Sequence, residues 1–123
     1  MKGERTALLE AWTDERAAAA TARRLNDWAE EWRHLERAHI LSQPMALPHI
    51  RTHVDMLSYA VRRRDVRELA GQLFRVAVAG PGSLTGRYPV GNTGGANVSA
   101  FRRMPIPDDL RPLLEPGLPA DSR

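Results

Sequence analysis

The sequence predicts an all-α protein, and three observations support this prediction. Apolar residues recur at the spacing of helix turns in four segments, approximately residues 5–24, 28–42, 48–64 and 66–79. Asp27 and Asp65 each precede such a segment and are followed three residues later by a glutamate, which is the pattern of a helix capping box. After Gly82 the chain becomes rich in Gly, Asn, Ser and Pro, and it loses the helical spacing.

The first two predicted helices are expected to pair. The first combines an apolar stripe that includes Leu8 with the alanine run of residues 17–20, which has high helix propensity. In the second, Trp28, Trp32 and Leu35 recur at helical spacing and define a buried face. Because only a short break separates these helices, we expect them to form an antiparallel hairpin.

The third and fourth predicted helices form a second hairpin. Pro48 suits the first turn of the third helix, where its missing N–H costs nothing, and residues 62–64 place three arginines at its end. The fourth helix is expected to bury an apolar stripe that includes Leu73 and Phe74. The Gly-Pro-Gly sequence of residues 80–82 is expected to end it.

This second hairpin resembles a tetratricopeptide repeat, which is a helix-turn-helix of about 34 residues. Ala70, Phe74 and Ala77 match the small-aromatic-small trio of that repeat. Small residues let two helices approach each other closely, and we expect Phe74 to fill the wedge between them. We therefore predict two antiparallel helical hairpins that form a tetratricopeptide-like four-helix unit.

The chain is long enough for one domain, which we divide into three parts. Residues 1–82 form the helical unit. Residues 83–115 form an irregular, Gly/Pro-rich C-terminal arm, which is expected to pack on the helices because Val90, Val98 and Ile106 supply apolar anchors. Residues 116–123 are expected to be a disordered tail.

The composition restricts the function. The chain of 123 residues has no cysteine, so any metal must bind to nitrogen and oxygen atoms. The formal net charge is +3, but acidic residues are interleaved with the arginines, which argues against nucleic-acid binding. No apolar run is long enough to cross a membrane, and no secretory signal pattern is present near Met1. We therefore expect a cytoplasmic protein without a membrane partner.

Four segments resemble a bacterial family, the domain of unknown function 3703. These segments are residues 34–43, 49–53, 62–73 and the glycine-rich stretch 89–102. The resemblance covers nearly the whole chain after about Asp27. One departure is Val54, which stands where relatives usually have a tryptophan. The resemblance implies a small helical bacterial protein, and it supplies no established activity or catalytic residues.

Three of the four histidines lie around the junction of the second and third predicted helices. His39 and Glu36 are three residues apart, and His49 and His53 are four apart, so each pair shares one helix face. Antiparallel packing brings these four side chains within about one helical turn, roughly 5 Å of rise. His-x-x-x-His on a helix presents two imidazoles to one ion. We therefore predict that these four residues bind a divalent transition metal, either Zn, Ni, Cu or Fe.

Further polar residues lie close to this predicted site in the sequence. Gln43 and Asp55 are candidates to accept hydrogen bonds from the ring N–H groups of the histidines. Residues 91–97, rich in Gly and Asn, lack the Lys-Ser/Thr of a phosphate-binding loop. We expect this segment to form turns with positive φ that lie against the helices.

Other interpretations of the same residues stay open. The histidines can form a buried polar hinge without metal, with Glu36 paired to a nearby arginine. The main alternative function is a tetratricopeptide-like adaptor that binds a protein partner and no metal. A metal-free acid/base enzyme that uses the same histidines is a third possibility, so no catalytic residue is assigned. The apolar ends of stacked hairpins also leave open a homo-oligomer.

Overall fold

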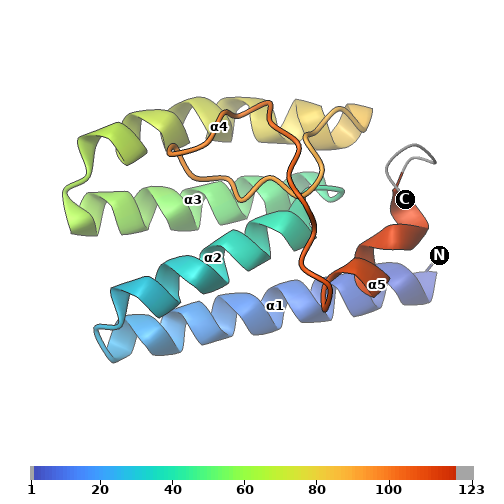
Figure 1. Ribbon diagram of the computed structural model, residues 1–123, viewed down its shortest axis with the longest axis horizontal. Coiled ribbons are helices and arrows are strands. Elements are labelled where there is room, and N and C mark those ends of the chain that lie inside the picture. Colours follow the sequence, from blue (N-terminus) through green and yellow to red (C-terminus); the bar gives the residue numbers. More distant parts are fainter. Residues whose placement is uncertain (1, 119–123) are drawn as a thin grey trace.

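The computed structural model describes residues 2–118, and Figure 1 shows that this part of the chain is helical throughout its regular structure. The helices are α1 Lys2–Arg24, α2 Trp28–Ser42, α3 Ala46–Arg63, α4 Val66–Thr85, α5 Arg111–Leu114 and the short 3-10 helix η1 Glu115–Gly117. The predicted all-α class is confirmed. Helix α1 packs along α2, α3 packs along α4, and α2 also contacts α3. Within residues 2–118, none of the helices combines the length and apolar character that crossing a membrane requires.

The predicted N-caps of α2 and α4 are confirmed. The side chain of Asp27 accepts a hydrogen bond from the backbone N–H of Glu30 at 3.1 Å, and that of Asp65 accepts one from Glu68 at 3.0 Å. Each bond satisfies a backbone donor that the first helical turn leaves free. Arg64 ends α3 in the left-handed conformation with φ of 54°, so the chain reverses directly into α4.

The predicted end of α4 is wrong. The helix continues through Pro81 to Thr85, and it ends at Gly86, which has φ of 72°. Gly80 lies within α4 and lets this helix approach α3 closely. A Cβ atom at this position would lie 2.9 Å from Cδ1 of Ile50. The extra turn matters for the site, since it carries Ser83.

The predicted buried face of α4 is also wrong. Leu73 is 58% exposed and Phe74 is 50% exposed, and neither fills a wedge between α3 and α4. The buried residues of this helix are mostly polar: Glu68, Gln72, Arg75, Ala79 and Gly80. The arm explains this reversal, because its backbone supplies partners for Glu68 and Gln72. The polar face of α4 is therefore the inner face.

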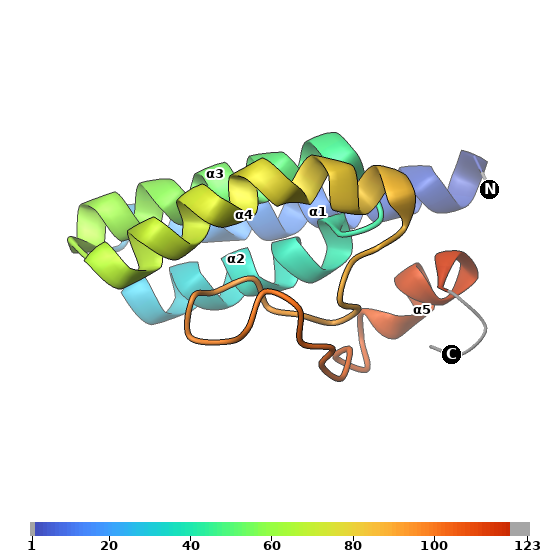
Figure 2. The same ribbon diagram turned by 90° about the horizontal axis from the view of Figure 1, so that it is seen from above.

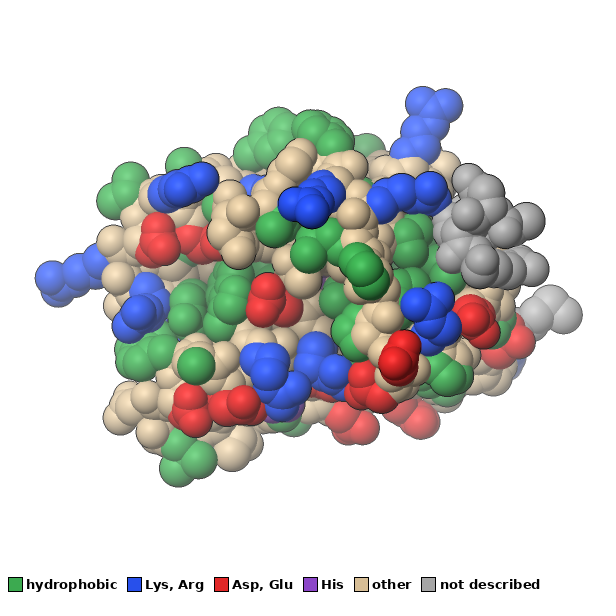
Figure 3. Space-filling view, in the orientation of Figure 1, with side chains coloured by type: hydrophobic (Ala, Val, Ile, Leu, Met, Phe, Trp, Pro, Cys, Tyr) green, Lys and Arg blue, Asp and Glu red, His purple; other side chains and the backbone are tan. Residues whose placement is uncertain are grey.

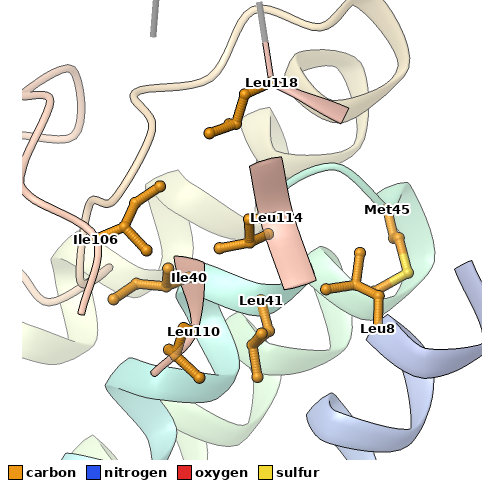
Figure 4. Close-up of a cluster of buried hydrophobic side chains, with 8 residues drawn as sticks. All are labelled: Leu8, Ile40, Leu41, Met45, Ile106, Leu110, Leu114 and Leu118. Carbon is orange, nitrogen blue, oxygen red and sulfur yellow. The ribbon is translucent and has the colours of Figure 1, made fainter. Parts of the chain in front are cut away.

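In the structure the arm begins after α4 and comprises residues 86–118. It lies along one face of the helices and then closes the main core (Figures 1 and 2). Figure 4 shows that core, in which α5 and the segments beside it meet α1 and α2. Its buried members are Leu8, Ile40, Leu41, Met45, Ile106, Leu110, Leu114 and Leu118. Full burial of a side chain of this size contributes about 1.5–3 kcal/mol, so the end of the arm stabilises the fold.

The disordered tail predicted from residue 116 is not observed in residues 116–118. Pro116 and Gly117 belong to η1, and Leu118 is only 4% exposed because it packs in the core. The rest of that predicted tail, residues 119–123, lies outside the described residues.

Candidate metal centre

Three histidines converge between α2 and α3. His39 lies near the end of α2, and His49 and His53 lie one turn apart near the start of α3. The three side chains are buried, with at most 5% of each residue exposed. Their Nε2 atoms are separated by 3.0 Å, 3.1 Å and 3.2 Å, so they form a nearly equilateral triangle.

The Nδ1 atom of each ring points away from this triangle and contacts an oxygen atom. The contacts join His39 to the carbonyl of Asn92 at 2.6 Å, His49 to Oγ of Ser83 at 2.8 Å, and His53 to Oε1 of Gln72 at 2.6 Å. These partners come from α4 and from the arm. The site therefore depends on three segments of the chain that are distant in sequence.

These partners assign the ring protons. A backbone carbonyl only accepts, so Nδ1 of His39 must donate. The amide nitrogen of Gln72 donates to the carboxylate of Glu68 and to the carbonyl of Gly94, each at 2.8 Å, which leaves its oxygen to face His53. The hydroxyl of Ser83 donates to the carbonyl of Gln43 at 2.6 Å, so it accepts from His49. With every Nδ1 protonated, each neutral ring presents a lone pair at Nε2.

Burial keeps these rings neutral. It is the main cause that holds the pKa of His39 well below 6.5, and the neighbouring His53 and His49 act in the same direction. Burial also lowers the pKa of His49 to about 3 and that of His53 to about 4. Three buried acceptor lone pairs thus point at one another without a proton between them. An unsatisfied buried acceptor costs about 1–3 kcal/mol, so a cation at this place would be strongly favoured.

The triangle has suitable dimensions for a metal ion. In a triangle with edges of 3.1 Å, each corner lies about 1.8 Å from the centre. This is close to the usual zinc–nitrogen distance of about 2.0–2.1 Å, so the three nitrogen atoms could hold one such ion. In the described part of the chain, residues 2–118, no further acidic, cysteine or histidine side chain joins them, so one coordination position would be left without a protein ligand. Three protein ligands and one open position are the arrangement of catalytic zinc sites.

Glu36, the fourth predicted ligand, is not part of this group. The ligand atoms of the three histidines lie within 4.8 Å of one another, and no fourth acidic, cysteine or histidine side chain among residues 2–118 joins them. The carboxyl group of Glu36 bonds to Thr93 instead, and partial burial raises its pKa. The partner of Glu36 is therefore Thr93 of the arm, in place of the metal ion that we had expected.

The predicted hydrogen-bond partners of the rings were wrong as well. Gln43 donates to the carbonyl of Pro89 at 2.8 Å and accepts from the N–H of Gly91 at 3.1 Å, so its side chain holds the arm. Asp55 pairs with Arg16 at 2.6 Å on the other side of α3. The partners that sequence reasoning missed are Gln72, Ser83 and Asn92. The sequence contained a signal for Gln72, because Glu68, Gln72 and Arg75 recur at helical spacing and form a polar stripe.

The glycine-rich segment has the predicted positive-φ turns, at Gly91 and Gly94, with φ of 78° and 89°. The second of these glycines also contacts the site. A Cβ atom on Gly94 would lie 2.6 Å from two ring carbon atoms of His39, so only glycine lets the arm cover that ring.

Comparison with protein families identifies the chain. The model of the family described as "Protein of unknown function (DUF3703)" matches residues 6–114. The chain belongs to this family. The matched residues include all three site histidines and the arm that covers them. No curated protein and no solved structure matches the chain in the same comparisons, so its function must be inferred from the site itself.

A small cavity opens beside the histidines of this DUF3703 protein. Its volume is about 100 Å³, and all three rings contribute to its lining. Arg75 of α4 and Tyr88 and Phe101 of the arm line it as well. The candidate metal position is therefore connected to a space that a small molecule can enter.

Proposed function

We propose that this protein binds one divalent transition metal ion through the Nε2 atoms of His39, His49 and His53. The observation that carries the proposal is the convergence of three neutral, buried lone pairs within 3.2 Å of one another. The Nδ1 contacts support it further, because they orient each ring as ligating histidines are usually oriented. In this proposal Glu36 is a nearby carboxylate and makes no bond to the ion.

The all-nitrogen ligand set defines the class of metal. Imidazole suits Zn, Ni, Cu and Fe, whereas Mg and Ca prefer oxygen ligands. Three protein ligands would leave at least one coordination position free, and all three rings line the cavity. Such a site supports the binding or activation of a small ligand, and no catalytic residue is assigned to this chain.

Elemental analysis of tag-free protein tests the proposal. We expect about one equivalent of a transition metal per chain after purification or after loading with Zn followed by dialysis. His53→Ala should lose most of this metal because two nitrogen ligands remain. His34→Ala is the matched control, since His34 contacts Glu15 and lies outside the triangle. Folded protein that ignores added Zn, Ni, Cu and Fe would contradict the proposal.

A second candidate function, binding of another protein, is favoured by an exposed apolar surface. Leu47, Val54 and Val61 are seven residues apart along α3, so they lie on one stripe, and all are exposed. Figure 3 shows that hydrophobic side chains are also exposed on the edge of the molecule where α4 lies. Exposed apolar surfaces of this kind commonly mark protein contacts. We propose that a second copy of the chain covers this surface, on a tetratricopeptide-like pair of hairpins.

Light scattering after size-exclusion chromatography tests this second candidate. The double variant Val54→Glu with Val61→Glu should weaken a dimer at least tenfold, because it places buried charges in the contact. Leu25→Glu is the control, since Leu25 is also exposed and lies in the turn after α1, not on α3. A wild-type chain that is monomeric at high concentration would exclude the dimer. The metal content should be the same in all three proteins.

A further inference from the structure

The cavity beside the histidines limits the size of any molecule that could reach the metal. Its volume of about 100 Å³ is well below the roughly 300–1,000 Å³ of typical ligand pockets. The occupant that the cavity accepts is therefore small, unlike a nucleotide or a peptide.

Arg75 gives the cavity a positive charge. The residue is only 7% exposed, it lines the cavity, and burial lowers its pKa. One of its guanidinium nitrogen atoms donates to the carbonyl of Val98 at 2.7 Å. None of the ion pairs among residues 2–118 includes Arg75, and a guanidinium has five N–H donors. A buried guanidinium without a carboxylate partner is the kind of group that binds an anion.

The charges around the site also favour a bound anion. The positive charge of Arg75 is close enough to lower the pKa of both His39 and His53. The nearest carboxylate that influences Arg75 is that of Glu68, which already accepts from Gln72 and from the backbone N–H of Ala96. A divalent ion on three neutral ligands would leave this buried region with an excess of positive charge. Because unpaired buried charge is costly, a bound anion would stabilise the loaded site.

We propose that the open position of the metal binds a small carboxylate or inorganic oxyanion, with one oxygen on the ion and another accepting from Arg75. The proposal rests on the metal binding proposed above and specifies the ligand class of that same site. The small cavity volume suits small anions such as formate, acetate, bicarbonate or phosphate. Arg75 is a binding residue in this proposal.

Cobalt-loaded protein provides the test, because the visible spectrum of Co(II) responds to a change in its ligands. The Co(II) protein is titrated separately with acetate, bicarbonate and phosphate. We expect a saturable spectral change with at least one of these three anions. Arg75→Gln should bind that anion at least tenfold more weakly at equal cobalt content. Arg102→Gln, a change at an exposed arginine outside the cavity lining, should leave the affinity unchanged.

The outcomes separate the two proposals. Bound Co(II) whose spectrum ignores all three anions would overturn the anion proposal and leave metal binding intact. Equal anion affinity in wild type and Arg75→Gln would also overturn it. If the chain binds no Co(II) and no Zn, both proposals fail together. Should Arg75→Gln not fold, Arg75→Lys serves instead, and it should retain charge but bind the anion more weakly because it loses the planar fork of donors.

Discussion

Gln72→Leu is expected to lower the free energy of unfolding by about 3–5 kcal/mol. The side chain of Gln72 is fully buried, and it joins α4 to α3 and to the arm. Leucine has a similar size but would leave the ring of His53, the carboxylate of Glu68 and the carbonyl of Gly94 without this partner. Each unsatisfied buried group costs about 1–3 kcal/mol. Urea unfolding followed by circular dichroism measures the loss, which is a large part of a typical stability of 5–15 kcal/mol.

The neighbouring substitution Leu73→Gln is the matched control. It exchanges the same two residue types in the opposite direction, one position along α4, and the side chain of Leu73 is mostly exposed. We expect it to change stability by less than about 0.5 kcal/mol. In the fraction of Gln72→Leu that folds, metal affinity should also fall about 10- to 100-fold, because the ring of His53 loses the group that orients it. Equal stability of the two variants would show that the polar network of α4 contributes little.

The sequence predicted correctly those parts of the fold that depend on interactions between residues close together in the chain. Asp27 and Asp65 cap their helices through bonds to residues three positions later, so local sequence was sufficient. The triangle of histidines also followed from spacing, because two positions four apart on one helix share a face wherever the helix packs. Antiparallel packing of α2 and α3 then brought His39 to the other two rings.

The errors have a common physical cause, which is the arm. Helix α4 carries an apolar stripe and a polar stripe, and periodicity alone favours burial of the apolar one. The arm reverses this choice because its backbone N–H and C=O groups bond to Glu68 and Gln72 from a distance of more than twenty residues. Glu36 was misassigned for the same reason, since Thr93 of the arm is its partner. The arm has no periodicity, so its position was not predictable from spacing.

The second large effect is expected on acidification of the metal-free protein. The pKa values of His49 and His53 are about 3 and about 4 in the folded protein, against about 6.5 in an unfolded chain. Between these values the unfolded chain binds more protons, so stability is complete above about pH 6.5 and falls as the pH decreases. Each such histidine contributes up to about 1.4 kcal/mol per pH unit. The two histidines together therefore lower the free energy of unfolding by up to about 2.7 kcal/mol for each unit that the pH falls. His39 adds to this loss, because its pKa is also lowered.

Urea unfolding at a series of pH values between 7.5 and 5.0 measures this loss before most carboxylates titrate. His49→Gln should reduce the slope by about 1.4 kcal/mol per pH unit, because one of the titrating groups is absent. His34→Gln is the control, because His34 lies outside the triangle beside Glu15, and it should keep the wild-type contribution of the three site histidines. A metal-free protein with constant stability across this range would contradict the neutral, buried state of the rings.

Bound metal should raise stability by the same amount throughout this pH range. At a free concentration of 100 times the Kd, a ligand adds about 2.7 kcal/mol, or roughly 10 °C in Tm for a chain of this size. Metal ligands must be unprotonated, and here the folded protein already holds its histidines neutral, so no proton leaves when metal binds. The Kd should therefore stay constant, and the increment should be equal at pH 7.5 and pH 5.5 when the free metal concentration is the same. If the Kd instead rises by about tenfold for each histidine and each pH unit, protons compete with the metal in the folded state, and the burial that we assign to this site would be wrong.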